Sequence, residues 1–97
     1  MFVIAAQWYA REGKHEEVAT LAKQMIPHTR AEPGCRLFTV NQSTDDPRKF
    51  LLYEQFADRA AFEAHTATTA FKDIVAGKIV PLLETRVREV YELVEPK

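Results

Sequence analysis

The stretch FLLYEQFADRAAFEAHTATTAF, residues 50–71, decides the fold. Its opening segment, residues 50–56, is dense in aromatic and aliphatic side chains, which favours a β-strand. Side chains alternate along a strand, so Glu54 is expected to share one face with three apolar residues. These are Phe50, Leu52 and Phe56. The pattern therefore places one carboxyl group on a mostly apolar face.

A helix is expected directly after this strand. Asp58 is a good N-cap, because its side-chain oxygen can accept hydrogen bonds from the first free amides of a helix. Phe62 and His65 then fall at helical spacing, so the imidazole is expected on the same inward face as the phenyl ring. An acid and an imidazole thus point toward apolar surface from neighbouring elements. The rest of the chain is interpreted as the scaffold that brings Glu54 and His65 together.

Composition indicates one small globular domain spanning residues 1–97. Hydrophobic residues make up 46% of the chain, which is too many for a disordered segment. The net charge of −1 argues against a nucleic-acid-binding surface. The sequence shows neither an apolar run that could span a membrane nor a signal-peptide pattern, and its lone Cys35 cannot form an internal disulfide. A cytoplasmic location is the expectation that follows.

Three further segments have strand chemistry, and their order with the helices predicts the fold. They cover residues 2–9, 35–42 and 85–94, with a polar loop at 43–48. The element order is then β-α-β-β-α-α-β. This order predicts an α+β fold with a ferredoxin-like, four-stranded antiparallel sheet and helices on one face.

Two helical patterns flank the central stretch. One begins at Lys14, and Pro27 is expected to end or kink that helix because proline lacks the amide donor. The other runs from Phe71 to Ile79, with Gly77 and Pro81 expected to mark its end.

The sheet is expected to mediate dimerisation. Both faces of the strands at 2–9 and 50–56 are largely apolar, although the predicted helices can cover only one face. An uncovered apolar face would form a large exposed patch, so a symmetric homodimer packed sheet against sheet is predicted. The alternative is a second face that is aromatic and partly wet.

Three parts of the sequence resemble the antibiotic biosynthesis monooxygenase family. They are the turn EPGC at 32–35, the strand FLLYEQF at 50–56, and a helical segment with Ala61, His65, Thr66, Phe71 and Lys72 in the family's register. The resemblance covers nearly the whole chain. Phe56 stands where Trp is frequent in the family, which could alter the floor of a pocket.

The resemblance implies both an assembly and a chemistry. Members of the family form dimeric α+β barrels. They include cofactor-free monooxygenases that oxidise quinols or aromatic polyketides, and a sugar-phosphate isomerase that processes a quorum-sensing signal. For this chain the resemblance implies a cofactor-independent monooxygenase that acts on a quinol or polyphenol with dioxygen. It does not specify the substrate.

His65 and Glu54 are the candidate catalytic residues. Dioxygen reacts with an electron-rich phenolate or enolate more readily than with the neutral molecule, so such an enzyme needs a base. Imidazole titrates near neutral pH and suits that task, and Glu54 would be its polar partner.

Other side chains could bind the substrate. Aromatic side chains suit the walls of a pocket for a ring, and a cation would stabilise developing negative charge. The candidate walls are Trp8, Phe38, Phe56 and Phe71, and the candidate cation is Arg86 or its neighbour Arg88.

Other interpretations stay open at this point. His65 and Glu54 could also supply the base and the acid of an isomerase, although the apolar strands favour an aromatic ligand over a sugar phosphate. The domain could instead bind a small aromatic molecule without converting it. His65 could be a packing residue and Glu54 a salt-bridge partner. Scattered histidines and the absence of a glycine-rich loop predict no metal and no nucleotide-type cofactor.

Overall fold

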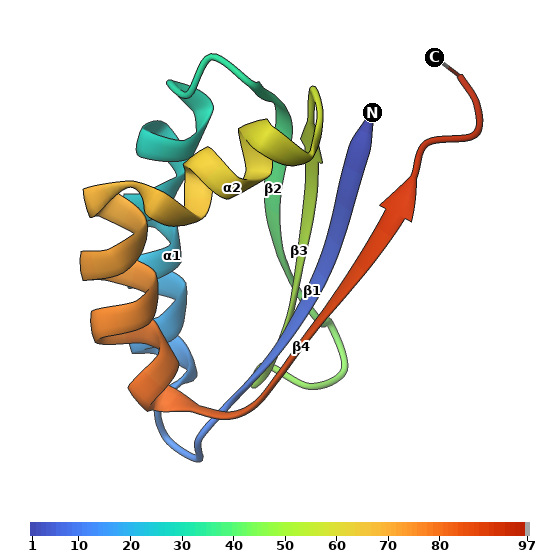
Figure 1. Cartoon of the computed structure of the whole chain (residues 1–97). Coiled ribbons are helices and arrows are strands. Elements are labelled where there is room, and N and C mark those ends of the chain that lie inside the picture. Colours follow the sequence, from blue (N-terminus) through green and yellow to red (C-terminus); the bar gives the residue numbers. More distant parts are fainter. Residues whose placement is uncertain (97) are drawn as a thin grey trace.

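The computed structural model describes residues 1–96 as a layer of helices packed on one face of a four-stranded antiparallel sheet (Figure 1). The strands are β1 (Phe2–Ala10), β2 (Cys35–Gln42), β3 (Lys49–Phe56) and β4 (Leu83–Glu92). Their order across the sheet is β2-β3-β1-β4. The predicted ferredoxin-like α+β fold is confirmed.

The helical layer encloses the core against the sheet. It consists of α1 (His15–Arg30), α2 (Arg59–Ala67), the π-helix η1 (Phe71–Ile79) and the short 3-10 turn η2 (Val80–Leu82). The largest fully buried apolar side chains come from both layers and are Ile4, Val18, Met25, Phe50, Phe56 and Ile79. Within residues 1–96, no helix is long and apolar enough to cross a membrane.

The first helix is longer than predicted. It runs through Pro27 and ends at Arg30, so of the two expected effects of Pro27, an end or a kink, the end is wrong. Proline removes one amide donor, but the same face of α1 still buries Met25 and Thr29 against the sheet. The carbonyl of Pro27 also accepts a hydrogen bond from the amide of Ala31 at 3.2 Å. Burial of Met25 on this face opposes the loss of one hydrogen bond, whereas the buried hydroxyl of Thr29 has no hydrogen-bond partner within residues 1–96.

The stripe that begins at Phe71 packs inward as predicted, since Val75 and Ile79 are buried. Its winding differs from the expectation, because the segment forms a π-helix with Gly77 inside it rather than at its end. A Cβ at Gly77 would lie only 3.2 Å from the carbonyl oxygen of Lys72. Glycine therefore fits this wide turn, where the backbone approaches closely.

Strand boundaries agree with the sequence to within two residues. The largest difference is at β4, which begins at Leu83 and not at Thr85. Leu83 is buried and pairs with Ala10 across a register shift, which extends the strand toward η2.

Within residues 1–96, no element covers the sheet face opposite the helices. Gln7 of β1 pairs with Leu51 of β3 on one side and with Val87 of β4 on the other, so the three side chains form a row across this face. Leu51 and Val87 are 40% and 50% exposed, and Tyr91 on the same face is 50% exposed. Homodimerisation through this face remains a prediction.

Candidate active site

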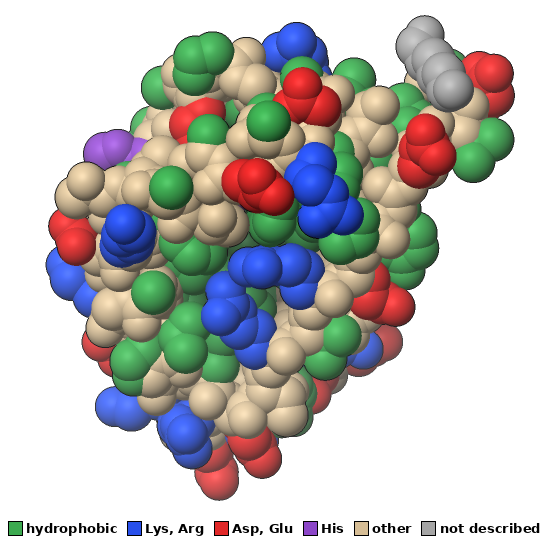
Figure 2. Space-filling view, viewed as in Figure 1, with side chains coloured by type: hydrophobic (Ala, Val, Ile, Leu, Met, Phe, Trp, Pro, Cys, Tyr) green, Lys and Arg blue, Asp and Glu red, His purple; other side chains and the backbone are tan. Residues whose placement is uncertain are grey.

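A pocket opens between the helical layer and the sheet, toward the edge strand β4. Figure 2 shows a hollow on this side, with hydrophobic side chains inside it and basic side chains across its opening. The free space is about 450 Å³ when the opening to solvent is included. The larger apolar side chains that line it are Trp8, Met25, Phe38, Val40, Leu52, Phe62, Phe71 and Val75. The polar ones are Glu54, His65, Arg86 and Arg88.

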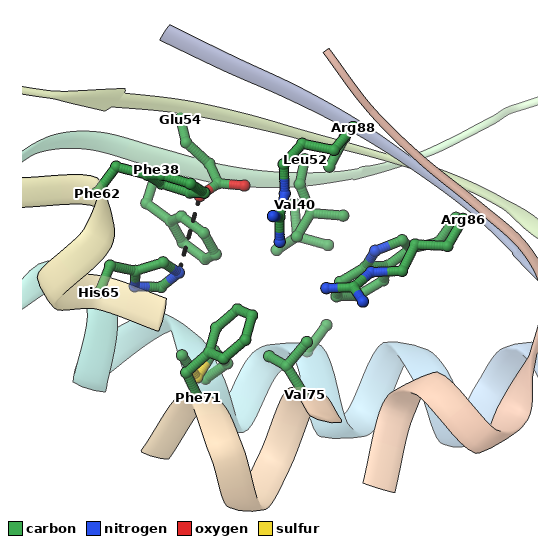
Figure 3. Close-up of a pocket in the computed structure, with 14 residues that line it drawn as sticks. Phe38, Val40, Leu52, Glu54, Phe62, His65, Phe71, Val75, Arg86 and Arg88 are labelled. Carbon is green, nitrogen blue, oxygen red and sulfur yellow. Dashed lines mark ion pairs between the residues drawn. The ribbon is translucent and has the colours of Figure 1, made fainter. Parts of the chain in front are cut away.

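Glu54 lies on β3 and points into this pocket, as its strand position predicts (Figure 3). Its strand partners are Ile4 on β1 and Phe38 on β2, so an apolar residue lies beside it on each side. The side chain is buried, and its Oε1 has no hydrogen-bond partner among residues 1–96. Burial raises the pKa of Glu54 to about 8, although the positive charge of Arg88 partly opposes this shift. Glu54 is therefore mostly protonated at neutral pH and can donate a hydrogen bond into the pocket.

His65 reaches the same pocket from α2. The helix begins as predicted, because the side chain of Asp58 accepts a hydrogen bond from the amide of Ala61 at 2.8 Å. Nδ1 of His65 lies 2.9 Å and 3.1 Å from the two carboxylate oxygens of Glu32. A carboxylate can only accept hydrogen bonds, so Nδ1 carries a proton and donates a hydrogen bond to Glu32. Nε2 is thereby directed toward Glu54, whose Oε1 lies 3.9 Å away.

Glu32 was interpreted from the sequence only as part of a turn. The structure adds it to the site as the hydrogen-bond acceptor for His65. Its place depends on the glycine that follows: a Cβ at Gly34 would lie 2.3 Å from the Cβ of Ala61. The turn can therefore approach α2 only with glycine there, and this approach sets Glu32 against His65. The acidic residue at the start of the EPGC turn was the feature of the sequence that could have indicated a hydrogen-bond partner for His65.

Aromatic rings surround the imidazole. Phe71 lies edge-on to His65 at 5.1 Å between ring centroids, and Phe38 and Phe62 both lie at 6.1 Å. Phe38 and Phe71 were expected at the pocket wall and are found there, and Phe62 is an addition. Phe56 is not among the lining residues, because it is fully buried and packs against the imidazole at 5.2 Å.

The opening of the pocket is basic. Arg86 and Arg88 occupy alternate positions of β4, where their Cα atoms pair with Trp8 and Ala6 of β1. Both side chains extend over the pocket (Figure 3). The guanidinium of Arg88 lies 5.1 Å from the ring centroid of Phe62. Partial burial and the neighbouring charge of Arg88 lower the pKa of Arg86 below its ordinary value.

The arrangement combines a base, an acid and an apolar chamber. The free Nε2 of His65 can take a proton, and the protonated Glu54 can donate one, with Glu32 stabilising the imidazolium form. Four of the five predicted side chains for substrate binding line this pocket together with both predicted catalytic ones. Within residues 1–96, no three side chains are grouped so that they could hold a metal ion.

Fold and pocket define the class of protein: a small ferredoxin-like α+β domain with an acid–base pair in an aromatic chamber. The chain also matches the family model described as antibiotic biosynthesis monooxygenase over residues 1–77. The match spans most of the chain and includes the turn of Glu32, Glu54 and His65. The protein belongs to the antibiotic biosynthesis monooxygenase family.

Individual relatives agree with this membership. The Bacillus subtilis protein named "Putative monooxygenase YcnE" is 29% identical over 76 residues, which is 78% of this chain and 80% of that protein. A crystal structure of an antibiotic biosynthesis monooxygenase superposes with a TM-score of 0.91 at 26% identity, covering 98% of this chain and 100% of the other. An uncharacterized protein of Synechocystis is 27% identical over 96% of this chain, which spans 63% of that relative's length. These relationships support a monooxygenase-like function.

Proposed function

We propose that this protein is a cofactor-independent monooxygenase that oxidises a quinol or another polyphenol. The observation that carries the proposal is the pairing of His65 and Glu54 at the end of an apolar pocket, with Nε2 of His65 3.9 Å from Oε1 of Glu54. A phenol placed in this chamber would meet a base held in one tautomer by Glu32.

The reaction begins with proton transfer. Nε2 of His65 takes the hydroxyl proton of the quinol, and the carboxylate of Glu32 stabilises the resulting imidazolium. The phenolate then gives one electron to dioxygen, which yields superoxide and a semiquinone radical. The apolar walls keep both radicals together until they combine at a ring carbon to form a peroxide.

The second half of the reaction releases water. The ring carbon that carries the peroxide loses its hydrogen as a proton, and the electrons of that C–H bond form a new C=O bond as the O–O bond breaks. One oxygen atom stays on the ring, and the distal oxygen is protonated and leaves as water. For a naphthoquinol the balance is one quinol plus one dioxygen to one hydroxyquinone plus one water. The substrate supplies all four electrons that dioxygen takes up, so the proposed reaction needs no external reductant. Glu54, protonated at neutral pH, suits the role of proton donor.

We also propose that the enzyme works as a homodimer through the uncovered sheet face. The row formed by Leu51, Gln7 and Val87 supports this proposal, because two of its three members are large apolar residues that are at least 40% exposed. Burying this row in a second copy would remove apolar surface from water.

Proton-transfer chemistry is the second candidate. An acid and a base 3.9 Å apart, Glu54 and His65, also fit an isomerase that moves a proton beside a carbonyl group. The apolar lining of the pocket favours an aromatic ligand over a sugar phosphate, which ranks this candidate below the oxygenase.

Oxygen uptake tests the proposal. A panel of naphthoquinols and polyphenols is incubated with the wild type, with His65→Ala, and without enzyme, since quinols autoxidise. His28→Ala is the matched control, because this histidine is exposed and lies outside the pocket. We expect uptake above the blank with the wild type and with His28→Ala, its loss with His65→Ala, and one ¹⁸O atom from labelled dioxygen in the product. No uptake above the blank with any substrate would reject the oxygenase in favour of the isomerase or of ligand binding alone.

A further inference from the structure

The two arginines at the pocket opening have no assigned task in the proton and electron transfers described above. Arg86 and Arg88 lie on the same face of β4 and both extend over the chamber, with Arg88 nearer to Glu54 in Figure 3. Four other arginines of the chain donate hydrogen bonds within the protein; they are Arg11, Arg30, Arg36 and Arg48. Within residues 1–96, the side chains of Arg86 and Arg88 form no hydrogen bond and no ion pair; the same is true of Arg59, which lies outside the pocket.

Their charge is also not neutralised by the nearest acid. Glu54 is the acid in the same pocket, but it is mostly protonated at neutral pH because burial raises its pKa to about 8. Glu32 is already engaged by the imidazole of His65. Two guanidinium groups therefore face one apolar chamber without a counter-charge, an arrangement that favours an incoming anion.

A second observation indicates that a ligand belongs in the same chamber. Oε1 of Glu54 is buried, directed into the pocket, and without a hydrogen-bond partner among residues 1–96. Buried polar atoms in proteins are nearly always paired. Within residues 1–96, the pocket thus presents one unpaired polar atom of Glu54 and, at its opening, two guanidinium groups without an ion-pair partner, of which that of Arg88 lies over the ring of Phe62.

We propose that Arg86 and Arg88 form a carboxylate-binding subsite, so that the preferred ligand is a hydroxy-aromatic carboxylate. This inference rests on the proposed function and names its substrate class. The carboxylate lies against the guanidinium groups, the ring fills the apolar chamber, and the hydroxyl group meets Glu54 and His65. A planar carboxylate matches the fork of N–H donors of an arginine, which favours it over a compact neutral group. The enclosed part of the pocket is narrow, so the side chains of Arg86 and Arg88 at its opening must move outward to admit the ring.

Isothermal titration calorimetry with ligands that resist oxidation tests this subsite apart from catalysis. The probes are 6-hydroxy-2-naphthoate and its neutral amide, which share the same ring system and nearly the same shape and carry the hydroxyl and carboxyl groups at opposite ends. The proteins are the wild type, Arg86→Gln, Arg88→Gln, the double variant, and Arg11→Gln. The last variant removes the same charge from an arginine that hydrogen-bonds to Pro81 away from the pocket.

We expect the wild type to bind the carboxylate at least tenfold more tightly than the amide. Each pocket variant should weaken carboxylate binding by about tenfold and leave amide binding unchanged, while Arg11→Gln should behave as the wild type. Both arginines are exposed, so these variants are expected to fold, and far-ultraviolet circular dichroism verifies this. Equal binding of acid and amide, equal losses for both ligands, or no binding of the acid at millimolar concentration would overturn the inference.

The two proposals fail in different ways. Selective binding of the carboxylate together with no oxygen uptake on hydroxy-aromatic substrates would keep the subsite and reject the oxygenase. Oxygen uptake on neutral quinols without any preference for the acid would keep the oxygenase and reject the subsite.

Discussion

Nδ1 of His65 lies 2.9 Å from Oε2 of Glu32, although the two residues are 33 positions apart in the chain. The bond joins the turn before β2 to the helix after β3, and it fixes which ring nitrogen of His65 faces the pocket. In the proposed mechanism Glu32 is therefore a positioning residue, which acts on the substrate only through the imidazole that it holds.

Glu32→Gln should lower the turnover number for quinol oxidation by about tenfold or more, because an amide can offer either an acceptor or a donor to Nδ1 and cannot stabilise the imidazolium. Oxygen uptake measures this change, and Glu32→Asp should recover part of the activity since it keeps the charge. The ¹⁵N shifts of the His65 ring should show a mixture of tautomers in the glutamine variant. Glu63→Gln, an exposed acid on α2, serves as the control. Unchanged ring shifts in Glu32→Gln would contradict the positioning role.

Glu54 should make the protein less stable as the pH rises. Its pKa is about 8 in the folded state against 4.5 for the ordinary group, so the folded state binds more protons than the unfolded state between these values. Stability is then fully present below about pH 4.5, declines through this window, and levels off above pH 8. The slope can reach about 1.4 kcal/mol per pH unit.

Urea denaturation of the wild type and of Glu54→Gln at pH 5, 6, 7 and 8 measures this dependence. Glutamine keeps the shape and cannot ionise, so the variant should show a flatter pH profile and exceed the wild type in stability at pH 8. Parallel profiles for both proteins would show that Glu54 does not titrate in this window.

Which residues of each strand share a face of the sheet could be predicted from the sequence, because side chains alternate between the two faces with a period of two residues. Alternation along β3 placed Glu54 on an apolar face, and the structure shows that this face packs toward the helices. Alternation along β4 placed Arg86 and Arg88 on one common face but did not show that this face borders the pocket. Helical spacing and the Asp58 cap placed His65 on the inward face of its helix. These are local rules, and they hold wherever one face of an element is buried.

The features that the sequence did not reveal depend on contacts between distant segments. Glu32 reads as a turn residue because nothing near it in the chain shows that α2 packs against that turn. Phe56 was predicted to line the pocket because side-chain alternation shows which face of the strand it occupies. Alternation does not show how deeply a side chain is buried, and Phe56 is fully buried against the ring of His65. α1 continues past Pro27 with one face packed against the rest of the protein, where Met25 is buried, and such a tertiary contact can override a local signal.

Gly34→Ala should destabilise the protein by about 1–3 kcal/mol, because the added Cβ would lie 2.3 Å from the Cβ of Ala61 and the turn must move away from α2. The same movement should withdraw Glu32 from His65 and lower activity. The double variant Gly34→Ala/Ala61→Gly removes the clash and should recover much of the stability, apart from about 1 kcal/mol for glycine in a helix. Urea denaturation of the single and double variants measures both effects. If the losses of stability from the two substitutions simply add in the double variant, the contact between residues 34 and 61 is not the reason why Gly34→Ala destabilises the protein.

The uncovered sheet face should hold two copies together. Val87→Asp places a charge beside Gln7 and Leu51 in the central row of that face, where a partner sheet would bury it, so the variant should dissociate to a monomer. Sedimentation equilibrium should give twice the chain mass of 11.1 kDa for the wild type and the single mass for Val87→Asp. Ala76→Asp is the matched control, because this residue is exposed on η1, in the helical layer that covers the opposite face of the sheet. A wild type that sediments as a monomer at micromolar concentration would reject the dimer, and dissociation of the Ala76→Asp variant would show that the interface involves the helical layer.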